Sequence, residues 1–353
     1  MYKKNFSLLK KAIITFSALA FIFVNMTIPA LAIDTSGDTE YLDAITLLEK
    51  LGILVPEDQM QYSEETVSRE DFAGMTGVFY GFLRDDAGAT ESVSKFGDVD
   101  ITAPNYGNIE FAVSMGILDV DSDGNFRPSQ DVTVGEAVKA MLVILGYNQV
   151  NPQNDDVFYR KQGQSLKLLY GIRSTYSSPI TKGELVRILT KTLDTNPLQR
   201  DSIGLDATFS VNKGKTLLNE RFGTYKLSGV LQATSITGIG TFGAVRKGHI
   251  LLGGYDIETD EDFSDFLGMY ITAYCKGNEN LTELELLYGF PMSGRNKTLI
   301  VNTGDVTGVK GDTLYYELDE RSKQVKIPNT ATIIYNGKNY PLVFSLTINV
   351  ARE

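Results

Sequence analysis

Residues 115–145 read MGILDVDSDGNFRPSQDVTVGEAVKAMLVIL and contain a helix end, a loop and a helix start. Gly116 supplies the left-handed residue that ends a helix, and Ile117 packs back on that helix. Thr133 and Glu136 have the spacing of a capping box. In this motif the hydroxyl accepts the N–H three residues on, and the carboxylate accepts the N–H of the capping residue. Apolar residues then recur at helical spacing, so the stretch predicts two helices joined by a loop.

The same order of features occurs in two further copies between residues 41 and 195. One helix pair cannot enclose its own core, so we expect the three copies to pack against one another around a shared axis. We take all three helix starts as capping boxes. The further helix ends are Gly52-Ile53 and Gly171-Ile172, and the further helix starts are Ser68 to Asp71 and Thr181 to Glu184.

The middle copy resembles the S-layer homology (SLH) family of bacterial surface proteins. Copies one and three match it at the Gly-Ile step and the capping box, and the resemblance covers residues 38–195. It implies a pseudo-threefold bundle whose inter-repeat grooves bind secondary cell-wall polysaccharide, often bearing pyruvate ketals. It also implies non-covalent anchoring to a Gram-positive type cell wall. The matching elements are Phe96-Gly97-Asp98-Val99, Gly116-Ile117, Asp123 to Pro128 and Val132 to Glu136.

Two basic residues are candidates for the anion contact that the resemblance implies. Arg69 and Lys182 each follow a capping hydroxyl, where unpaired N–H groups and the helix dipole present partial positive charge. A side-chain cation there makes a site for a polysaccharide carboxylate. Val134 takes this place in copy two, so we expect the groove that relies on it to bind anions poorly. The alternative is that both cations are solvated at helix starts, and in either case we expect them to face solvent.

Asp119, Asp121 and Asp123, followed by Gly124, resemble the start of an EF-hand calcium loop. The twelfth position of that loop is Gln130, so the bidentate glutamate is missing. The SLH-like pattern already accounts for the second half of this loop. We therefore assign no metal, and calcium binding stays an open alternative.

The charge and the inventory of side chains limit the classes of function. The 353 residues include 33 Lys and Arg against 44 Asp and Glu, giving a net charge of −11. An acidic chain is a poor candidate for nucleic-acid binding. With one His and one Cys in the chain, a catalytic triad or a multi-His metal site could draw on His249 alone. We expect neither enzymatic activity nor a cofactor.

The N-terminal segment has the pattern of a secretory signal peptide. Four lysines precede an apolar run over residues 12–24, and Ala30-Leu31-Ala32 follows as a cleavage site. The run is too short for a membrane span of about 20 residues. Cleavage after Ala32 removes four Lys and no acid, which takes the charge from −11 to −15. We expect an exported protein with no membrane span after cleavage.

The pattern changes after residue 196 to Gly-rich, alternating segments, which indicates an all-β sandwich or barrel-like domain. The fold class is therefore α + β and multidomain. The sequence does not indicate the role of this β-rich domain. Self-association of the protein in a surface layer is an open alternative. The expected strands are Tyr225 to Ala233, His249 to Leu252, Met269 to Tyr274, Leu299 to Asn302, Thr313 to Leu318, Thr332 to Tyr335, Lys338 to Leu342 and Phe344 to Val350. The expected segments are a signal peptide at 1–32, repeats at 33–90, 91–149 and 150–196, a linker at 197–206 and a β-rich domain at 207–353.

An acidic run between residues 256 and 265 supports the alternative function, a wall-anchored carbohydrate-active hydrolase. Such an enzyme needs two carboxyl groups that face a sugar from opposite sides. The structural reading is a capped short helix, because acids at a helix start are favoured by the dipole. We also expect His249 at a strand end and Cys275 buried as a small hydrophobe. The acids are Asp256, Glu258, Asp260, Glu261, Asp262 and Asp265.

Overall fold

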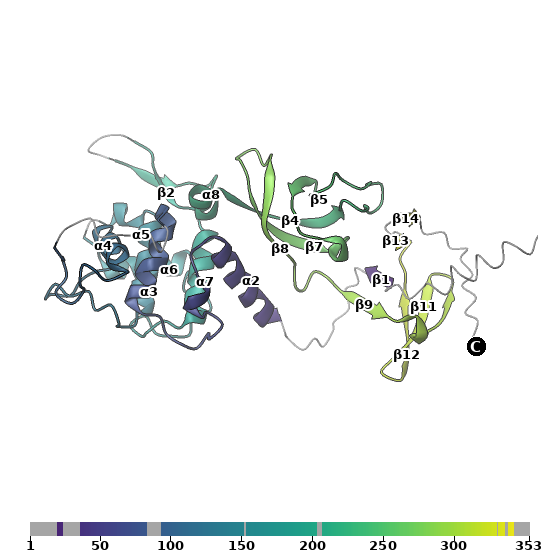
Figure 1. Ribbon diagram of the computed structural model, residues 1–353, viewed down its shortest axis with the longest axis horizontal. Helices are drawn as coiled ribbons and strands as arrows, with labels where there is room; N and C mark the ends of the chain where they lie inside the picture. The colour runs from purple at the N-terminus through teal and green to yellow at the C-terminus, as the bar shows by residue number, and fades with distance from the viewer. Residues whose placement is uncertain are drawn as a thin grey trace, which may run out of the picture. The chain divides into compact units, whose positions relative to one another are not determined.

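The computed structural model describes residues 20–23, 36–82, 93–151, 153–202, 207–329, 331–335 and 338–341. It is an α + β protein that divides into two compact units (Figure 1). The helical unit contains residues 34–226 and 274–282. The β unit contains strand β1 (Ala20–Phe23) and the described parts of residues 227–273 and 283–353. The helical unit therefore continues beyond residue 196, where we expected a linker.

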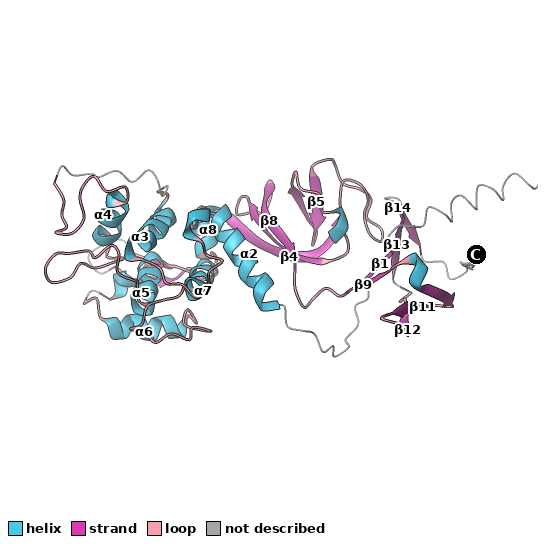
Figure 2. Cartoon of the chain, turned by 60° about the horizontal axis from the view of Figure 1, so that its bottom comes forward, coloured by secondary structure: helices cyan, strands magenta, loops and turns pink. Residues whose placement is uncertain are grey.

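The helical unit contains the helix pairs expected from the three copies (Figure 2, cyan). Gly52 and Gly116 have φ of +74° and +69°, which confirms the predicted left-handed ends of the first helices in copies one and two. The prediction that Gly171 ends the first helix of copy three was wrong, because that helix ends at Ser165 and its left-handed residue is Lys167, with φ of +60°. The α-helices are α2 (Ser36–Lys50), α3 (Arg69–Gly77), α4 (Tyr106–Ser114), α5 (Val134–Ile144), α6 (Asp156–Ser165), α7 (Lys182–Leu193) and α8 (Leu217–Phe222). Short 3₁₀ turns lie at Pro56–Asp58, Val78–Tyr80 and Tyr147–Val150, and β2 (Leu198–Arg200) pairs with β3 (Phe209–Val211).

The starts of α3, α5 and α7 are linked to one another through backbone hydrogen bonds. The N–H of Arg69 donates to Gln130 at 2.9 Å, that of Val134 to Ser178 at 3.0 Å, and that of Lys182 to Glu65 at 2.7 Å. Copy one thus bonds to the loop of copy two, copy two to copy three, and copy three back to copy one. The next N–H groups repeat the pattern, from Glu70 to Pro128, Gly135 to Tyr176 and Gly183 to Ser63.

The core of the helical unit is formed by the apolar faces of these helices. Phe72, Ile109, Met141 and Leu189 are fully buried. A Cβ on Gly163 would lie 2.6 Å from Cγ1 of Val138, so α6 approaches α5 closely because Gly163 has no side chain. The sequence places the same apolar periodicity in each copy, and burial of these faces stabilises the unit.

Five of the described strands form a closed barrel in the order β4-β5-β6-β8-β7. This confirms the barrel alternative for the C-terminal region. Most ladders are antiparallel, and β6 pairs with β8 in parallel. A Cβ on Gly229 would lie 2.8 Å from Cα of Gly253, so glycine allows β4 and β5 to approach where the barrel closes. The strands are β4 (Thr224–Ala233), β5 (His249–Leu252), β6 (Tyr255–Glu258), β7 (Tyr270–Lys276) and β8 (Leu284–Pro291).

The rest of the β unit consists of small antiparallel sheets. Strand β1 lies inside the predicted signal peptide and pairs with β9 (Thr298–Val301). Val301, Leu314 and Tyr316 form a small core. The predicted hairpin turn at residues 336–337 and the predicted last strand at 344–350 lie outside the described residues. The remaining strands are β10 (Val306–Lys310), β11 (Thr313–Leu318), β12 (Arg321–Lys326), β13 (Thr332–Tyr335) and β14 (Lys338–Pro341).

Candidate functional site

The starts of α5 and α7 are complete capping boxes, as predicted. The N–H of Thr133 donates to Glu136 at 2.9 Å, and the N–H of Glu136 donates back to the Thr133 hydroxyl at 3.2 Å. The start of α3 is incomplete. Ser68 accepts the N–H of Asp71 at 3.1 Å, but the Asp71 carboxylate accepts the Ser68 hydroxyl instead of its N–H. The predicted capping box at Ser68 is therefore half formed.

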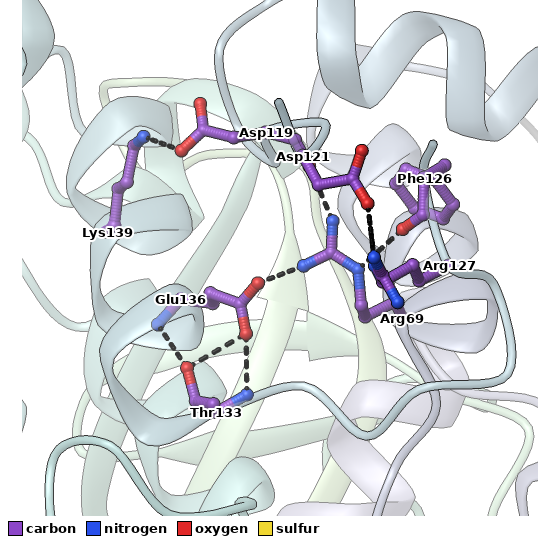
Figure 3. Close-up of polar contacts among 8 residues, drawn as sticks. All are labelled: Arg69, Asp119, Asp121, Phe126, Arg127, Thr133, Glu136 and Lys139. Atoms are coloured by element: carbon purple, nitrogen blue, oxygen red, sulfur yellow. Dashed lines mark hydrogen bonds and ion pairs between the residues drawn. The ribbon is translucent and has the colours of Figure 1, made fainter. Parts of the chain in front are cut away.

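Arg69 lies inside the protein, so the prediction that it faces solvent was wrong. The residue is 5% exposed, and its guanidinium pairs with Glu136 of the next copy (Figure 3). Its Nε donates to the carbonyl of Phe126 at 2.9 Å, and its Nη2 donates to the carbonyl of Asp119 at 2.6 Å. The guanidinium also lies 4.8 Å from the centre of the Phe126 ring. Arg69 therefore joins copy one to copy two.

The N–H groups expected to be free at the start of α3 are hydrogen-bonded within the protein. Arg69 and Glu70 donate to loop carbonyls of copy two, and Asp71 donates to the capping Ser68. The same donors are used at the starts of α5 and α7. The helix-terminus argument for an anion site was therefore wrong, because the loop of the neighbouring copy supplies the acceptors that a ligand would have supplied.

Lys182 is also drawn into contacts between copies. Its Nζ lies 2.9 Å from the carboxylate of Glu65 in copy one, and its side chain is 12% exposed. The expectation of a solvent-facing cation was wrong here too. Glu65 is itself 58% exposed, so this pair lies nearer the surface than the pair of Arg69 and Glu136.

Copy two has Val134 at the place where the other copies have a cation. Val134 is fully buried. The carboxylate at the third helical position of copy three, Glu184, is bound by backbone N–H groups, whereas Glu136 of copy two is bound by the Arg69 guanidinium. The carboxylate of Glu184 accepts the N–H groups of Arg173 and Ser174 at 2.7 and 2.8 Å. Burial acts to raise the pKa of Glu184, and the hydrogen bonds from Ser174 and Arg173 outweigh it, so this pKa lies below its usual value.

Lys139 is a part of this network that the sequence analysis did not identify. Its side chain is 6% exposed, and its ammonium donates to the carboxylate of Asp119, whose side chain is 62% exposed (Figure 3). The ring of Tyr159 lies 5.9 Å from the ammonium. The signal that could have revealed it is a lysine within the otherwise apolar run of residues 137–145. A cation in such a run must find a partner when the helix packs.

The acids of the EF-hand-like loop hold the loop itself. Asp121 accepts the N–H groups of Asp123 and Asn125, both at 2.9 Å, and pairs with Arg127. The hydrogen bond from Asn125 is the main cause that lowers the pKa of Asp121. Asp98 accepts the N–H of Arg127 at 2.7 Å. Within the described ranges, no group of three or more His, Cys, Asp or Glu side chains is arranged to hold a metal ion.

The acids between residues 256 and 265 are all exposed. Asp256 contacts Nδ1 of His249 at 2.9 Å, and His249 begins β5 as predicted. Asp262 accepts the N–H of Ser264 at 2.9 Å. The Ser264 hydroxyl and N–H beside this carboxylate lower its pKa, whereas the general acid of a glycosidase needs a raised pKa. A short 3₁₀ turn, Ser264–Phe266, follows in place of the expected α-helix. Cys275 is buried as predicted, and burial raises its thiol pKa to about 12.

Comparison with known proteins matches one segment of the helical unit to a known family. Residues 95–138 match the family described as the S-layer homology domain. The chain is 23% identical over 348 residues to a cell surface protein of Thermoanaerobacter kivui, covering 93% of this chain and 41% of that protein. The chain thus spans about two fifths of the length of that relative.

These findings carry a general conclusion about location. S-layer homology domains act in anchoring at the bacterial cell surface and generally bind cell-wall polysaccharides. In the part of the chain that the structure describes, no helix is long and apolar enough to cross a membrane. Asp119, Phe126, Glu136 and their loop all lie within the matched segment. Residues 95–138 are therefore an S-layer homology domain, and the chain is an SLH-containing surface protein.

Proposed function

We propose that the three copies form one pseudo-threefold SLH bundle that anchors the protein to the wall by binding secondary cell-wall polysaccharide. The observation that carries this proposal is the closed cycle of hydrogen bonds among the three helix starts. Because the middle copy is an S-layer homology domain and its neighbours repeat its contacts, the same role extends to all three. The cell surface is then that of a Gram-positive type bacterium, and the β unit is presented there.

Arg69 and Lys182 stay the proposed contacts to polysaccharide carboxylates, with less freedom than a solvent-facing cation would have. A guanidinium has five N–H donors. At least three of those on Arg69 donate within the protein, so at most two are left for a ligand oxygen. Lys182 has one carboxylate partner, Glu65, which is exposed enough to exchange with a ligand. Pyruvate ketals on the polymer are the proposed source of those carboxylates.

The protein is then non-enzymatic, with self-association in a surface layer as a second proposed interaction. The exposed acids at residues 256–265 and the lowered pKa of Asp262 support binding over hydrolysis. Release of reducing ends from wall glycans, lost in Asp260→Asn or Asp262→Asn, would instead support the hydrolase.

Co-sedimentation of the whole exported chain with purified cell wall tests the proposal. The expected result is retention on native wall, loss of retention once the secondary polymer is stripped from the peptidoglycan, and competition by the soluble polymer. Equal retention on the stripped wall would show that the chain recognises peptidoglycan or binds nonspecifically.

A further inference from the structure

We propose that Asp119 is an internal competitor for the ligand, and that its carboxylate occupies the position on Lys139 that a carboxylate of the wall polymer takes on binding. This inference rests on the proposed polysaccharide binding and adds to it a residue that regulates affinity. It adds Lys139, a residue that the helix-start pattern does not single out, to the proposed anion contacts.

The two partners of this ion pair differ in burial, because Lys139 is buried and Asp119 is exposed. The Lys139 side chain is 6% exposed, whereas the Asp119 side chain is 62% exposed. Figure 3 shows the contact between the Asp119 carboxylate and the Lys139 ammonium. Because the carboxylate is the exposed member of the pair, it lies between the buried ammonium and water. A buried ammonium needs an anionic partner, but that partner can be exchanged where it borders water.

In the neighbouring pair of Arg69 and Glu136, the carboxylate cannot be replaced by a ligand carboxylate in the same way. Glu136 is held by the guanidinium of Arg69 and also by the N–H and hydroxyl of Thr133. Among the described residues, the carboxylate of Asp119 accepts a hydrogen bond from Lys139 and from no other group. Release of Asp119 therefore breaks one side-chain contact, while release of Glu136 would break a helix cap as well.

Rotation of Asp119 also leaves the backbone in place. Its carbonyl accepts Nη2 of Arg69 at 2.6 Å, independently of the carboxylate. The side chain can turn into solvent while this hydrogen bond persists. Opening the site therefore requires a change of side-chain rotamer rather than a rearrangement of the loop.

The charges of the network define the ligand. Arg69 and Lys139 are balanced by Glu136 and Asp119. When Asp119 turns away, one positive charge is left beside a desolvated surface, and one carboxylate restores the balance. The site therefore favours an acidic substituent, such as a ketal-linked carboxylate, over a neutral sugar, which cannot compensate a buried ammonium.

The pair is specific to the middle copy. At the position of Lys139, copy one has Gly74 and copy three has Arg187. Counted from the left-handed residue that ends the first helix of each copy, the position of Asp119 is taken by Val55 in copy one and by Tyr170 in copy three. A competing carboxylate of this kind is therefore a property of the middle copy.

Titration of the whole exported chain with a purified pyruvylated wall polymer tests the inference. Asp119→Asn keeps the size of the side chain and removes its charge, so we expect about tenfold tighter binding, the order associated with one charge-assisted hydrogen bond. Asp123→Asn is the matched control, because it removes the same charge from an exposed position in the same loop. We expect the control to bind as the unaltered chain does.

Lys139→Met supplies the second arm, because it replaces the ammonium with an apolar group of similar length. We expect weaker binding, and no gain when Asp119→Asn is added. The gain should also vanish on polymer from which the pyruvyl groups have been removed. If the unaltered chain binds and Asp119→Asn binds no tighter, or gains on depyruvylated polymer or without Lys139, the inference is overturned while the proposed function stands. If no form binds either polymer, the proposed function fails and the inference falls with it.

Discussion

At the scale of single residues, Arg69 shows how far a side chain can act from its place in the sequence. It begins α3, and it pairs with Glu136, which caps α5 in the next copy. The spacing of Ser68 and Asp71 predicts the local helix start, because capping depends on neighbours within four residues. A partner 67 residues away leaves no local signal. This separation along the chain explains why the sequence identified Arg69 as a candidate but did not predict its buried contacts with copy two.

Arg69→Ala should lower the free energy of unfolding by about 3 kcal/mol, near the lower end for breaking a buried pair, because Glu136 is partly exposed. Thermal and urea unfolding measure this loss. Arg127→Ala is the control, since Arg127 pairs with Asp121 at the surface and should change stability much less. Equal stability of the two variants would mean that Arg69 is a surface cation after all.

Glu184 should make stability depend on acid pH. Its pKa in the folded protein lies below the ordinary value of 4.5, so its stabilising effect is full above that value and is lost as the pH falls through the folded pKa. Glu184→Gln should therefore be less stable than the unaltered chain at pH 7, and the difference should shrink on acidification. Urea unfolding between pH 7 and 3 measures it, with Glu64→Gln at an exposed position as the control. A pH-independent difference would contradict the assignment.

At the scale of elements, the repeated helix pairs were predictable, because each carries capping residues and an apolar face, and the Gly-Ile step marks the helix end in copies one and two. In copy three the helix ends earlier, at Ser165, where Lys167 takes the left-handed conformation that the sequence pattern assigned to Gly171. Strands β5 and β11 also begin and end where expected. Strand β12 was missed because its sequence, RSKQVK, is polar and mostly exposed. It is a strand because its backbone pairs with β11 across Thr313 to Leu318. Such recruitment depends on the partner and not on the pattern of the recruited segment.

The contact between the starts of α5 and copy three can be tested at Gly135. A Cβ there would lie 2.7 Å from Cε1 and 3.0 Å from the carbonyl of Tyr176. Alanine is favoured over glycine in helices by about 1 kcal/mol, yet overpacking costs about 1 to 3 kcal/mol. We expect Gly135→Ala to lower the melting temperature. Gly243→Ala is the control, because a Cβ added there would meet no atom within 4 Å. A higher melting temperature for Gly135→Ala would show that the loop around Tyr176 can move away from the start of α5.

At the scale of the whole chain, the sequence predicted the change from helices to strands but placed the boundary too early. The N–H of Leu198 donates to Leu145 at 2.8 Å, and that of Leu217 donates to Thr195 at 2.9 Å. These contacts tie residues 197–226 to the helical unit, and they join segments whose local sequences show no relation.

A fragment of residues 33–226 should therefore melt at a higher temperature than one of residues 33–196. Identical melting would mean that the added residues contribute nothing to the unit.

Hydrogen exchange of the whole chain with and without the wall polymer distinguishes recognition by the repeat bundle from recognition by the β unit. We expect slower exchange on binding in the segments that join neighbouring copies, around residues 63–70 and 119–139, and unchanged exchange in residues 227–273. Protection confined to the β unit, with the repeat segments unchanged, would contradict recognition by the repeat bundle.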